Sequence, residues 1–188
     1  MDGLERNDAA ERAVKEAYTL LQTGALEQAL ALFERAEQLF GEAGDGPRQT
    51  RVCTNKALLL ARMRRFEEAL DGFRKALGGF EREGEFIRVA EQWGNIGSVH
   101  RDMEQQDEAI KSYEEALTIY RKLGAKEREA DQCTNIAYAL SMKKELAEAL
   151  RWYREALPLY AEAGSEDKRG ITAGNAARLS AALEEEAK

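Results

Sequence analysis

The sequence has few of the residues that disulfide scaffolds, metal sites and catalytic centres need. Its 188 residues include two cysteines, two prolines and a single histidine. Two cysteines do not make a disulfide framework, and one histidine leaves a zinc site short of ligands and a general base short of a partner. A glycine-rich phosphate loop is also missing. We therefore expect no cofactor, no metal, no catalytic residues and no enzymatic activity.

Long apolar runs and an excess of basic charge are missing as well. No apolar run approaches the roughly 20 residues that a membrane-spanning helix needs, and residues 1–12 lack the apolar core of a signal peptide. With 28 Lys and Arg against 35 Asp and Glu, the formal net charge is −7, whereas nucleic-acid binding needs a basic face. The sequence predicts a cytoplasmic protein that binds neither nucleic acid nor membrane.

What remains is a helical composition that repeats. Ala, Leu, Glu and Arg, all strong helix formers, dominate the sequence, while β-branched residues are too scattered for strands. The tripeptide Cys-Thr-Asn occurs at 53–55 and again at 133–135, and asparagine recurs at 55, 95, 135 and 175. A fixed period of 40 residues is typical of stacked repeats. The alanines, aromatic residues and glycines with the same period are Ala29, Ala69, Ala109, Ala149, Ala36, Ala76, Ala116, Ala156, Phe33, Phe73, Tyr113, Tyr153, Phe40, Phe80, Tyr120, Tyr160, Gly44, Gly84, Gly124 and Gly164.

Each unit has the pattern of two helices. In the third unit, residues 86–103 predict the first helix and residues 107–123 the second, with a turn at 104–106. Apolar residues of the second helix recur at spacings of 3, 4 and 7, which places them on one face. The glycine that closes each unit supplies the left-handed residue that commonly ends a helix, and Pro47 stands where the first helix of the second unit should begin.

The third unit carries the most specific motif: Trp93, Gly97, Ala109, Tyr113 and Ala116 have the order and spacing of the tetratricopeptide repeat. The chain resembles this family over nearly its whole length. Its period exceeds the usual 34 residues and is similar to that of the subgroup found in Partner-of-Inscuteable-type spindle adaptors and bacterial peptide-responsive regulators. The resemblance implies an all-α fold, an α-α superhelix or solenoid, as a single domain over residues 1–188. The expected parts are helix-turn-helix repeats at approximately 5–44, 45–84, 85–124 and 125–164 and a capping helix at 165–188.

Three isolated features receive structural interpretations. Cys53 and Cys133 occupy the same position of units two periods apart, on the stripe facing the second helix, so we expect both to pack as small apolar residues. His100 aligns with leucines of the core stripe and is expected to be partly buried and structural. The residues expected to join the capping helix to the fourth repeat are Ala173, Ala176, Ala177 and Leu183.

One line of residues on each first helix, spaced i, i+4, i+7 and i+11, avoids the apolar core. We name it the first-helix stripe, and it consists of Glu11, Lys15, Tyr18, Gln22, Arg51, Asn55, Leu58, Arg62, Glu91, Asn95, Ser98, Asp102, Asp131, Asn135, Tyr138, Met142, Ile171, Asn175, Arg178 and Ala182. The resemblance implies that the first helices line a concave groove, which we expect to bind a peptide or a short helix of a partner protein. Asparagine amides pair with peptide groups of any sequence, and Arg and aromatic side chains are the usual anchors. The predicted peptide-binding residues are Lys15, Tyr18, Arg51, Asn55, Arg62, Asn95, Asn135, Tyr138, Asn175 and Arg178.

Alternatives stay open at this point. The asparagines can instead hydrogen-bond the adjacent helix, and Arg51 and Arg62 can pair with Glu91 and Asp102, with which they align. Residues 45–84 carry nine basic and six acidic side chains, a net charge of +3, which favours an acidic partner segment near the second repeat. The alternative function is a scaffold that forms homo-oligomers by stacking through its terminal repeats, because no separate cap precedes the first helix.

Overall fold

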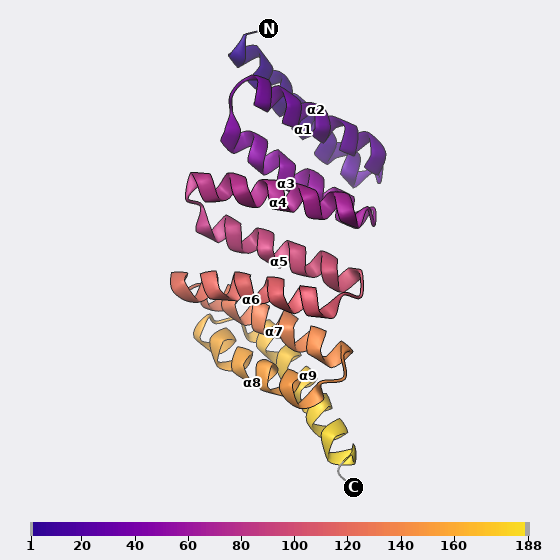
Figure 1. The fold of residues 1–188 in the computed structure, drawn as a ribbon, viewed down its shortest axis with the longest axis vertical. Coiled ribbons are helices and arrows are strands. Elements are labelled where there is room, and N and C mark those ends of the chain that lie inside the picture. Colours follow the sequence, from indigo (N-terminus) through magenta and orange to yellow (C-terminus); the bar gives the residue numbers. More distant parts are fainter. Residues whose placement is uncertain (1, 187–188) are drawn as a thin grey trace. The chain divides into compact units, whose positions relative to one another are not determined.

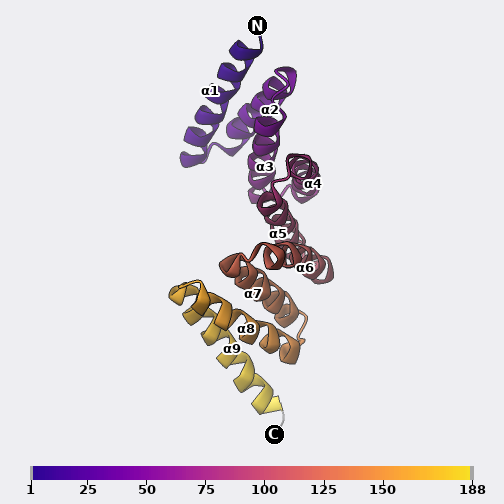
Figure 2. The same ribbon diagram turned by 90° about the vertical axis from the view of Figure 1, so that its left-hand side faces the viewer.

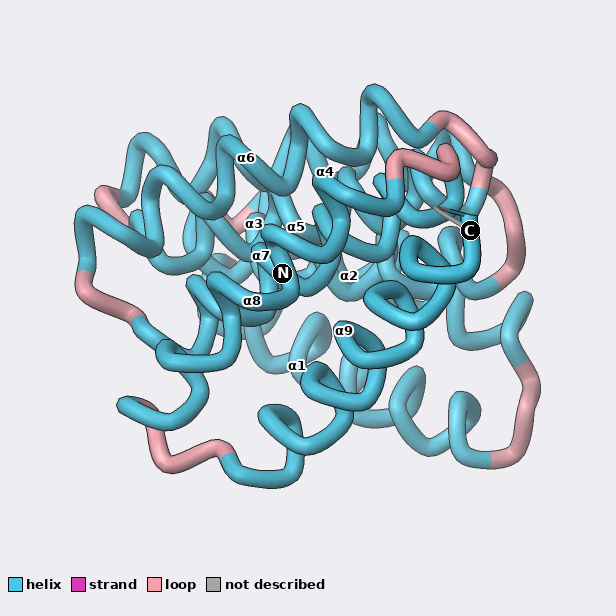
Figure 3. Tube along the Cα trace, turned by 90° about the horizontal axis from the view of Figure 1, so that it is seen from below, coloured by secondary structure: helices cyan, strands magenta, loops and turns pink. Residues whose placement is uncertain are grey.

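The computed structural model describes residues 2–186 of the chain. This part consists of α-helices joined by turns of two or three residues, and it contains no β-strand (Figure 3). The prediction of an all-α repeat fold is confirmed. The helices, labelled in Figure 1, are α1 (Gly3–Gln22), α2 (Leu26–Glu42), α3 (Gly46–Arg62), α4 (Phe66–Glu83), α5 (Phe86–Asp102), α6 (Gln106–Leu123), α7 (Lys126–Met142), α8 (Leu146–Glu162) and α9 (Glu166–Glu186). Residues 187 and 188 of the predicted capping helix lie outside the described residues.

Contacts between residues divide the chain into two compact units, residues 1–95 and residues 96–188, with the boundary inside α5. In the first unit α1 packs on α2, α2 on α3 and α3 on α4. In the second unit α6 packs on α7, α7 on α8 and α8 on α9 (Figure 2). Each unit is therefore a stack of helices that are neighbours in sequence. That all four repeats form one domain stays a prediction.

The turns between repeats have the conformation that the sequence predicts. The glycine that closes each unit has φ between 67° and 74°, in the left-handed region where a side chain is strained. Asp45 then caps α3, because its carboxylate accepts a hydrogen bond from the backbone N–H of Arg48 (3.1 Å), and Pro47 lies in the first turn of that helix. These local signals fix where the second repeat begins.

The turn inside each repeat also contains a left-handed residue, which the sequence did not indicate. It is a glycine only in the first repeat, at Gly24 (φ 79°). The equivalent residues Arg64, Glu104 and Lys144 have φ of 61°, 61° and 63°. A side chain in this region costs on the order of 1 kcal/mol. Three of the four inner turns therefore hold a non-glycine residue in a strained conformation.

The recurring alanines and aromatic residues form the cores of both units. The eight alanines are at most 1 % exposed and the eight aromatic residues at most 3 % exposed. Small residues let the paired helices approach closely, and the rings fill the space beside them. The helices also approach closely at Gly97, a residue of the repeat motif, where an added Cβ would lie 2.6 Å from the Tyr113 ring.

The last helix covers its neighbour with only part of the expected face. Ala176 is buried against Leu150 and Tyr153, and Leu183 packs against the same cluster. Ala173 and Ala177, however, are exposed, so their predicted contact with the fourth repeat is wrong. These two positions face the second helix of their own repeat elsewhere in the chain, and the described residues contain no such helix after α9.

Candidate functional site

Large apolar side chains are exposed along the first-helix stripe. Among the described residues, nine large hydrophobic side chains are exposed, and five of these lie on the stripe. Tyr18 and Leu58 belong to the first unit and are each 46 % exposed, whereas Tyr138, Met142 and Ile171 belong to the second and are 47 to 67 % exposed. Covering such side chains with a ligand removes apolar surface from water and therefore favours binding. The stripe therefore offers apolar side chains to a ligand in both units, and in the second unit it holds three of the four exposed large hydrophobic residues that the structure describes.

The asparagines of the stripe are half-buried, and three of them have no hydrogen-bond partner. Within the part of the chain that the structure describes, the amides of Asn55, Asn95 and Asn135 donate and accept no hydrogen bond. Asn175 differs, because its carbonyl accepts a hydrogen bond from the Arg178 guanidinium of the same helix. The alternative in which the amides bridge to an adjacent helix is therefore not seen at the first three positions. Their donors and acceptors remain available to a ligand.

A cavity of about 390 Å³ lies in the first unit and gathers four of the predicted binding residues: Lys15, Tyr18, Arg51 and Asn55. Its lining residues come from α1, the end of α2 and the first half of α3: Glu11, Val14, Lys15, Tyr18, Phe40, Arg48, Arg51, Val52 and Asn55. The cavity thus has an apolar wall and a polar, mainly basic rim. Arg62, by contrast, is exposed at the end of α3 and does not line it.

The side chains around this cavity hold one another in place. The Tyr18 ring meets the Phe33 ring edge to face at a centroid distance of 5.5 Å, and partial burial raises the pKa of the Tyr18 hydroxyl. The Arg48 guanidinium lies 5.8 Å from the centre of the Phe40 ring and pairs with Glu11 at 2.9 Å. The aromatic residues are thus fixed, while the charged groups of the rim stay in contact with water.

Arg51 pairs with a different carboxylate from the one that the repeat alignment suggests. Its Nη2 lies 2.8 Å from the Glu85 carboxylate, in the turn before α5, and not against Glu91. Glu91 itself accepts a hydrogen bond from Arg88 one turn earlier in the same helix. Because Arg51 and Glu85 are 50 % and 36 % exposed, this pair adds only about 0–1 kcal/mol and can exchange for a ligand carboxylate.

In the second unit, the stripe residue Asp131 has a structural role that the sequence did not reveal. Its carboxylate accepts hydrogen bonds from the Lys168 ammonium (2.8 and 3.0 Å) and from the Tyr160 hydroxyl (2.9 Å). Burial raises the pKa of Tyr160 to about 12. These bonds join α7, α8 and α9, so Asp131 is occupied, while Asn135 and Tyr138 on the same helix stay accessible.

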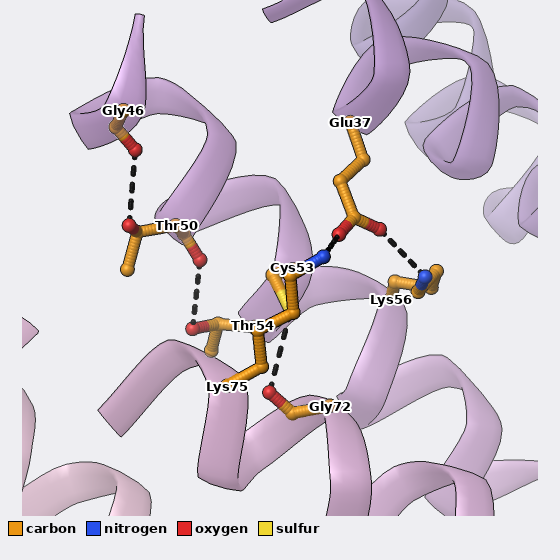
Figure 4. A network of polar contacts seen from close by, with 8 residues as sticks. All are labelled: Glu37, Gly46, Thr50, Cys53, Thr54, Lys56, Gly72 and Lys75. Atoms are coloured by element: carbon orange, nitrogen blue, oxygen red, sulfur yellow. Dashed lines mark hydrogen bonds and ion pairs between the residues drawn. The ribbon is translucent and has the colours of Figure 1, made fainter. Parts of the chain in front are cut away.

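A buried carboxylate lies outside the stripe and was also missed. Glu37 of α2 is 6 % exposed and is bound by Lys56 of α3 (2.6 Å) and by Lys75 of α4 (Figure 4). Burial opposes its ionisation, but the hydrogen bonds from the two lysines outweigh burial and hold the pKa of Glu37 below its usual range. Leucine occupies the equivalent positions of the other repeats, so no repeat pattern pointed to this group.

Both cysteines are buried, as predicted. Cys53 is 1 % exposed, and its thiol donates a hydrogen bond to the Gly72 carbonyl at 3.3 Å (Figure 4). Cys133 is fully buried, and burial raises its pKa to about 12. A thiol that stays protonated is a poor nucleophile. The two residues thus pack as small apolar side chains.

The single histidine contacts a side-chain amide. His100 is half-buried, and its Nδ1 lies 2.7 Å from the Gln105 side-chain oxygen. Residues 2–186 contain no group of three or more His, Cys, Asp or Glu side chains placed to hold a metal ion. In the same part of the chain, no helix is both long and apolar enough to cross a membrane.

Comparisons with known proteins show which family and which folds this chain is similar to. The sequence profile described as tetratricopeptide repeat matches residues 48–122 and 88–162, which together cover more than half of the chain. A search of curated proteins found no match. Among solved structures, the fold is similar to the apo form of RapI, with a TM-score of 0.77 and 18 % identity over 88 % of this chain and 61 % of that one. It is also similar to aspartyl phosphate phosphatase F from Bacillus subtilis, with a TM-score of 0.78 and 14 % identity over 96 % and 52 %. The chain thus spans about half to three-fifths of these structures, and the likeness concerns the fold.

Proposed function

The chain belongs to the tetratricopeptide repeat family, and on this basis we propose that it is a non-catalytic, cytoplasmic module that binds a peptide or a short helix of a partner protein along the first-helix stripe. The observation that carries the proposal is the exposure of apolar anchors next to half-buried amides without partners. Tyr138 and Asn135 on α7 are one such combination, and Tyr18 with Asn55 at the cavity is another.

Two kinds of contact would hold the ligand. In each unit the asparagine amides, those of Asn55 and Asn95 in the first and that of Asn135 in the second, would pair with peptide groups, which requires no particular sequence in the partner. Aromatic and aliphatic residues such as Tyr138 and Met142 would supply the apolar area, at about 25 cal/mol for each Å² removed from water. Backbone pairing would give general affinity, and the anchors would give preference for particular side chains.

The period of 40 residues and the similarity to RapI support a finer proposal, namely that the chain is of the long-period subgroup. Catalysis is not part of it, although one similar structure is named a phosphatase. The thiols are buried and protonated, and His100 contacts an amide instead of a nucleophile or a carboxylate. None of these groups is placed to attack or deprotonate a substrate.

Self-assembly through the terminal helices is the second candidate. The two most exposed large apolar side chains of the described residues are Leu4 of α1 (76 %) and Ile171 of α9 (67 %). Burial of these two side chains between copies of the chain would favour stacking. Light scattering after gel filtration over a hundredfold range of concentration separates the candidates, because a constant monomer mass eliminates stacking.

A quantitative pulldown tests the first candidate. Wild-type protein and the triple variant Arg51→Ala, Asn95→Ala, Asn135→Ala are used as bait, and captured proteins are identified by mass spectrometry. All three side chains reach solvent, so we expect the variant to fold with an unchanged circular dichroism spectrum. Partners that bind along the stripe should fall at least tenfold.

The matched control also changes three side chains, all of them exposed and on second helices: Gln28→Ala, Thr118→Ala, Arg154→Ala. It should retain every partner that the wild type captures. If the control loses the partners and the stripe variant keeps them, binding occurs on the second helices and the proposal is wrong.

A further inference from the structure

The cavity at the junction of the first two repeats has apolar residues at two positions where other junctions have polar ones. Val14 of α1 and Val52 of α3 both line it, and Val52 is 4 % exposed. One repeat later, the equivalent residues are Thr54 of α3 and Gln92 of α5. Gln92 is 1 % exposed, its amide donates to the Arg88 carbonyl, and Thr54 contacts its side-chain oxygen at 3.3 Å. Polar side chains that hydrogen-bond to each other thus occupy the later junction, whereas valines occupy these positions at the cavity.

The junction between α7 and α9 in the second unit gives the same contrast. There the equivalents of Val14 and Phe40 are Thr134 and Tyr160. The Tyr160 hydroxyl lies 3.4 Å from the Thr134 hydroxyl and donates to Asp131, which is also bound by Lys168. Phe40 has no hydroxyl group and cannot form such a network. Of the three junctions compared, the one between α1 and α3 alone has apolar residues at all three positions, namely Val14, Phe40 and Val52.

The rim of the cavity carries three cations, Lys15, Arg48 and Arg51, but only one carboxylate, Glu11. Arg48 and Glu11 are 46 % and 59 % exposed, so their pair is weak and exchangeable. The Lys15 ammonium forms no ion pair with the described residues. Outside the lining, Arg48 also contacts Asp45 (3.4 Å) and Arg51 contacts Glu85 (2.8 Å). Lys15 is therefore the rim cation without an ion pair among the described residues, in a protein whose formal net charge is −7.

We propose that this cavity is an anchor pocket for a large apolar side chain of a partner peptide that carries carboxylates beside that side chain. The inference rests on the proposed function and names the partner class of the same surface. The apolar wall takes a leucine-, methionine- or phenylalanine-sized group, in a space of the size that ligand pockets commonly have. Lys15 and Arg51 bind the flanking carboxylates, and the free amide of Asn55 pairs with the peptide backbone between them.

Valine methyl groups give a direct readout of this pocket. Valine occurs at positions 14, 52, 89 and 99 only, so methyl labelling of valine yields two probes in the pocket and two outside it. The ligand is a pool of blocked twelve-residue peptides with one Leu, Met or Phe between Asp or Glu residues. We expect the methyl resonances of Val14 and Val52 to shift on titration, and those of Val89 and Val99 to stay in place.

Three comparisons test which chemistry is recognised. Replacing the apolar residue of the peptide with Ser, or its acidic residues with Lys, should each raise Kd at least tenfold. Lys15→Glu should have a similar effect, while Lys122→Glu, an equal charge change at an exposed site of α6, should leave Kd within twofold.

The sharpest variant fills the pocket with the side chains of the next junction, Val14→Thr with Val52→Gln. Because Thr54 and Gln92 already occupy this geometry in the same unit, the double variant should fold and bind the acidic–apolar pool at least tenfold more weakly. Unchanged affinity, or shifts confined to Val89 and Val99, overturns the inference. Peptide binding that is lost on changing Asn95 and Asn135, but not on changing the valines, also overturns the inference. The proposed function would still hold in that case.

Discussion

The buried ion pair of the first unit offers a sharp test of how the repeats are joined. Two repeats after Glu37 and Lys56, the equivalent residues are Leu117 and Ile136. These two belong to one apolar cluster in the second unit and are 2 % and 0 % exposed. The equivalent helix junction thus contains an ion pair in the first unit and apolar side chains in the second. We predict that Glu37→Leu combined with Lys56→Ile stabilises the protein.

The magnitude follows from the exposure of the charged groups. The side chains of Glu37 and Lys56 are 8 % and 21 % exposed, so both lost most of their hydration on folding. Replacing such a pair by apolar residues is neutral or stabilising by about 1–4 kcal/mol. Since Lys56 keeps some water and Lys75, 61 % exposed, needs no partner, we expect the lower half of that range, about 1–2 kcal/mol. Glu37→Leu alone should instead cost about 1–3 kcal/mol, because it leaves the partly buried Lys56 ammonium without its hydrogen-bond acceptor.

Urea unfolding followed by circular dichroism measures both effects, and pH gives an independent check. The pKa of Glu37 is lowered in the folded state, so its stabilising contribution is present above the unfolded-state pKa and is lost as pH falls below about 4. Wild type should therefore lose more stability between pH 5 and pH 3 than the double variant does. A double variant less stable than wild type at pH 7, with an acid profile like that of wild type, would refute the reasoning.

Three further predictions concern the turns, the core and the cysteines. Glu104→Gly should stabilise the protein by about 0.5 kcal/mol, because relief of the strain at φ 61° exceeds the entropic cost of glycine, and thermal unfolding should show the increase. Gly97→Ala should cost about 1–2 kcal/mol in urea unfolding, since the new Cβ would lie 2.6 Å from the buried Tyr113 ring, despite the better helix propensity of alanine. Cys133, whose pKa burial raises to about 12, should react with iodoacetamide at pH 8 at least a hundredfold more slowly in the folded protein than in urea.

The sequence predicts the helices and the core because both depend on spacing within one helix. Residues such as Phe33 and Tyr113 recur at the same place in every unit, and each is buried. The exposed stripe is predictable for the same reason, since residues that avoid the apolar face of a helix must point elsewhere. This reasoning predicts that Tyr138 is accessible, and its side chain is 47 % exposed.

Features that depend on two helices at once were not predictable. The cavity is lined by Val14 and Val52, which lie 38 positions apart and match no motif. Glu91 is the alternative partner that the repeat alignment offers Arg51, but the Arg51 guanidinium lies against Glu85 in the turn before α5. Asp131 is a stripe residue, but its carboxylate is bound by Lys168 from α9. In each case the outcome depends on the distance between helices, which a repeat period does not specify.

Photo-crosslinking tests the central claim, binding along the first-helix stripe, most directly. Benzoylphenylalanine is placed at Leu58 or Tyr138 on the stripe and, as controls, at Thr118 or Arg154 on second helices, all of them exposed. We predict adducts with another protein from the two stripe positions and few from the controls. Adducts from the controls alone, or from the stripe to a second copy of this chain alone, would contradict the account.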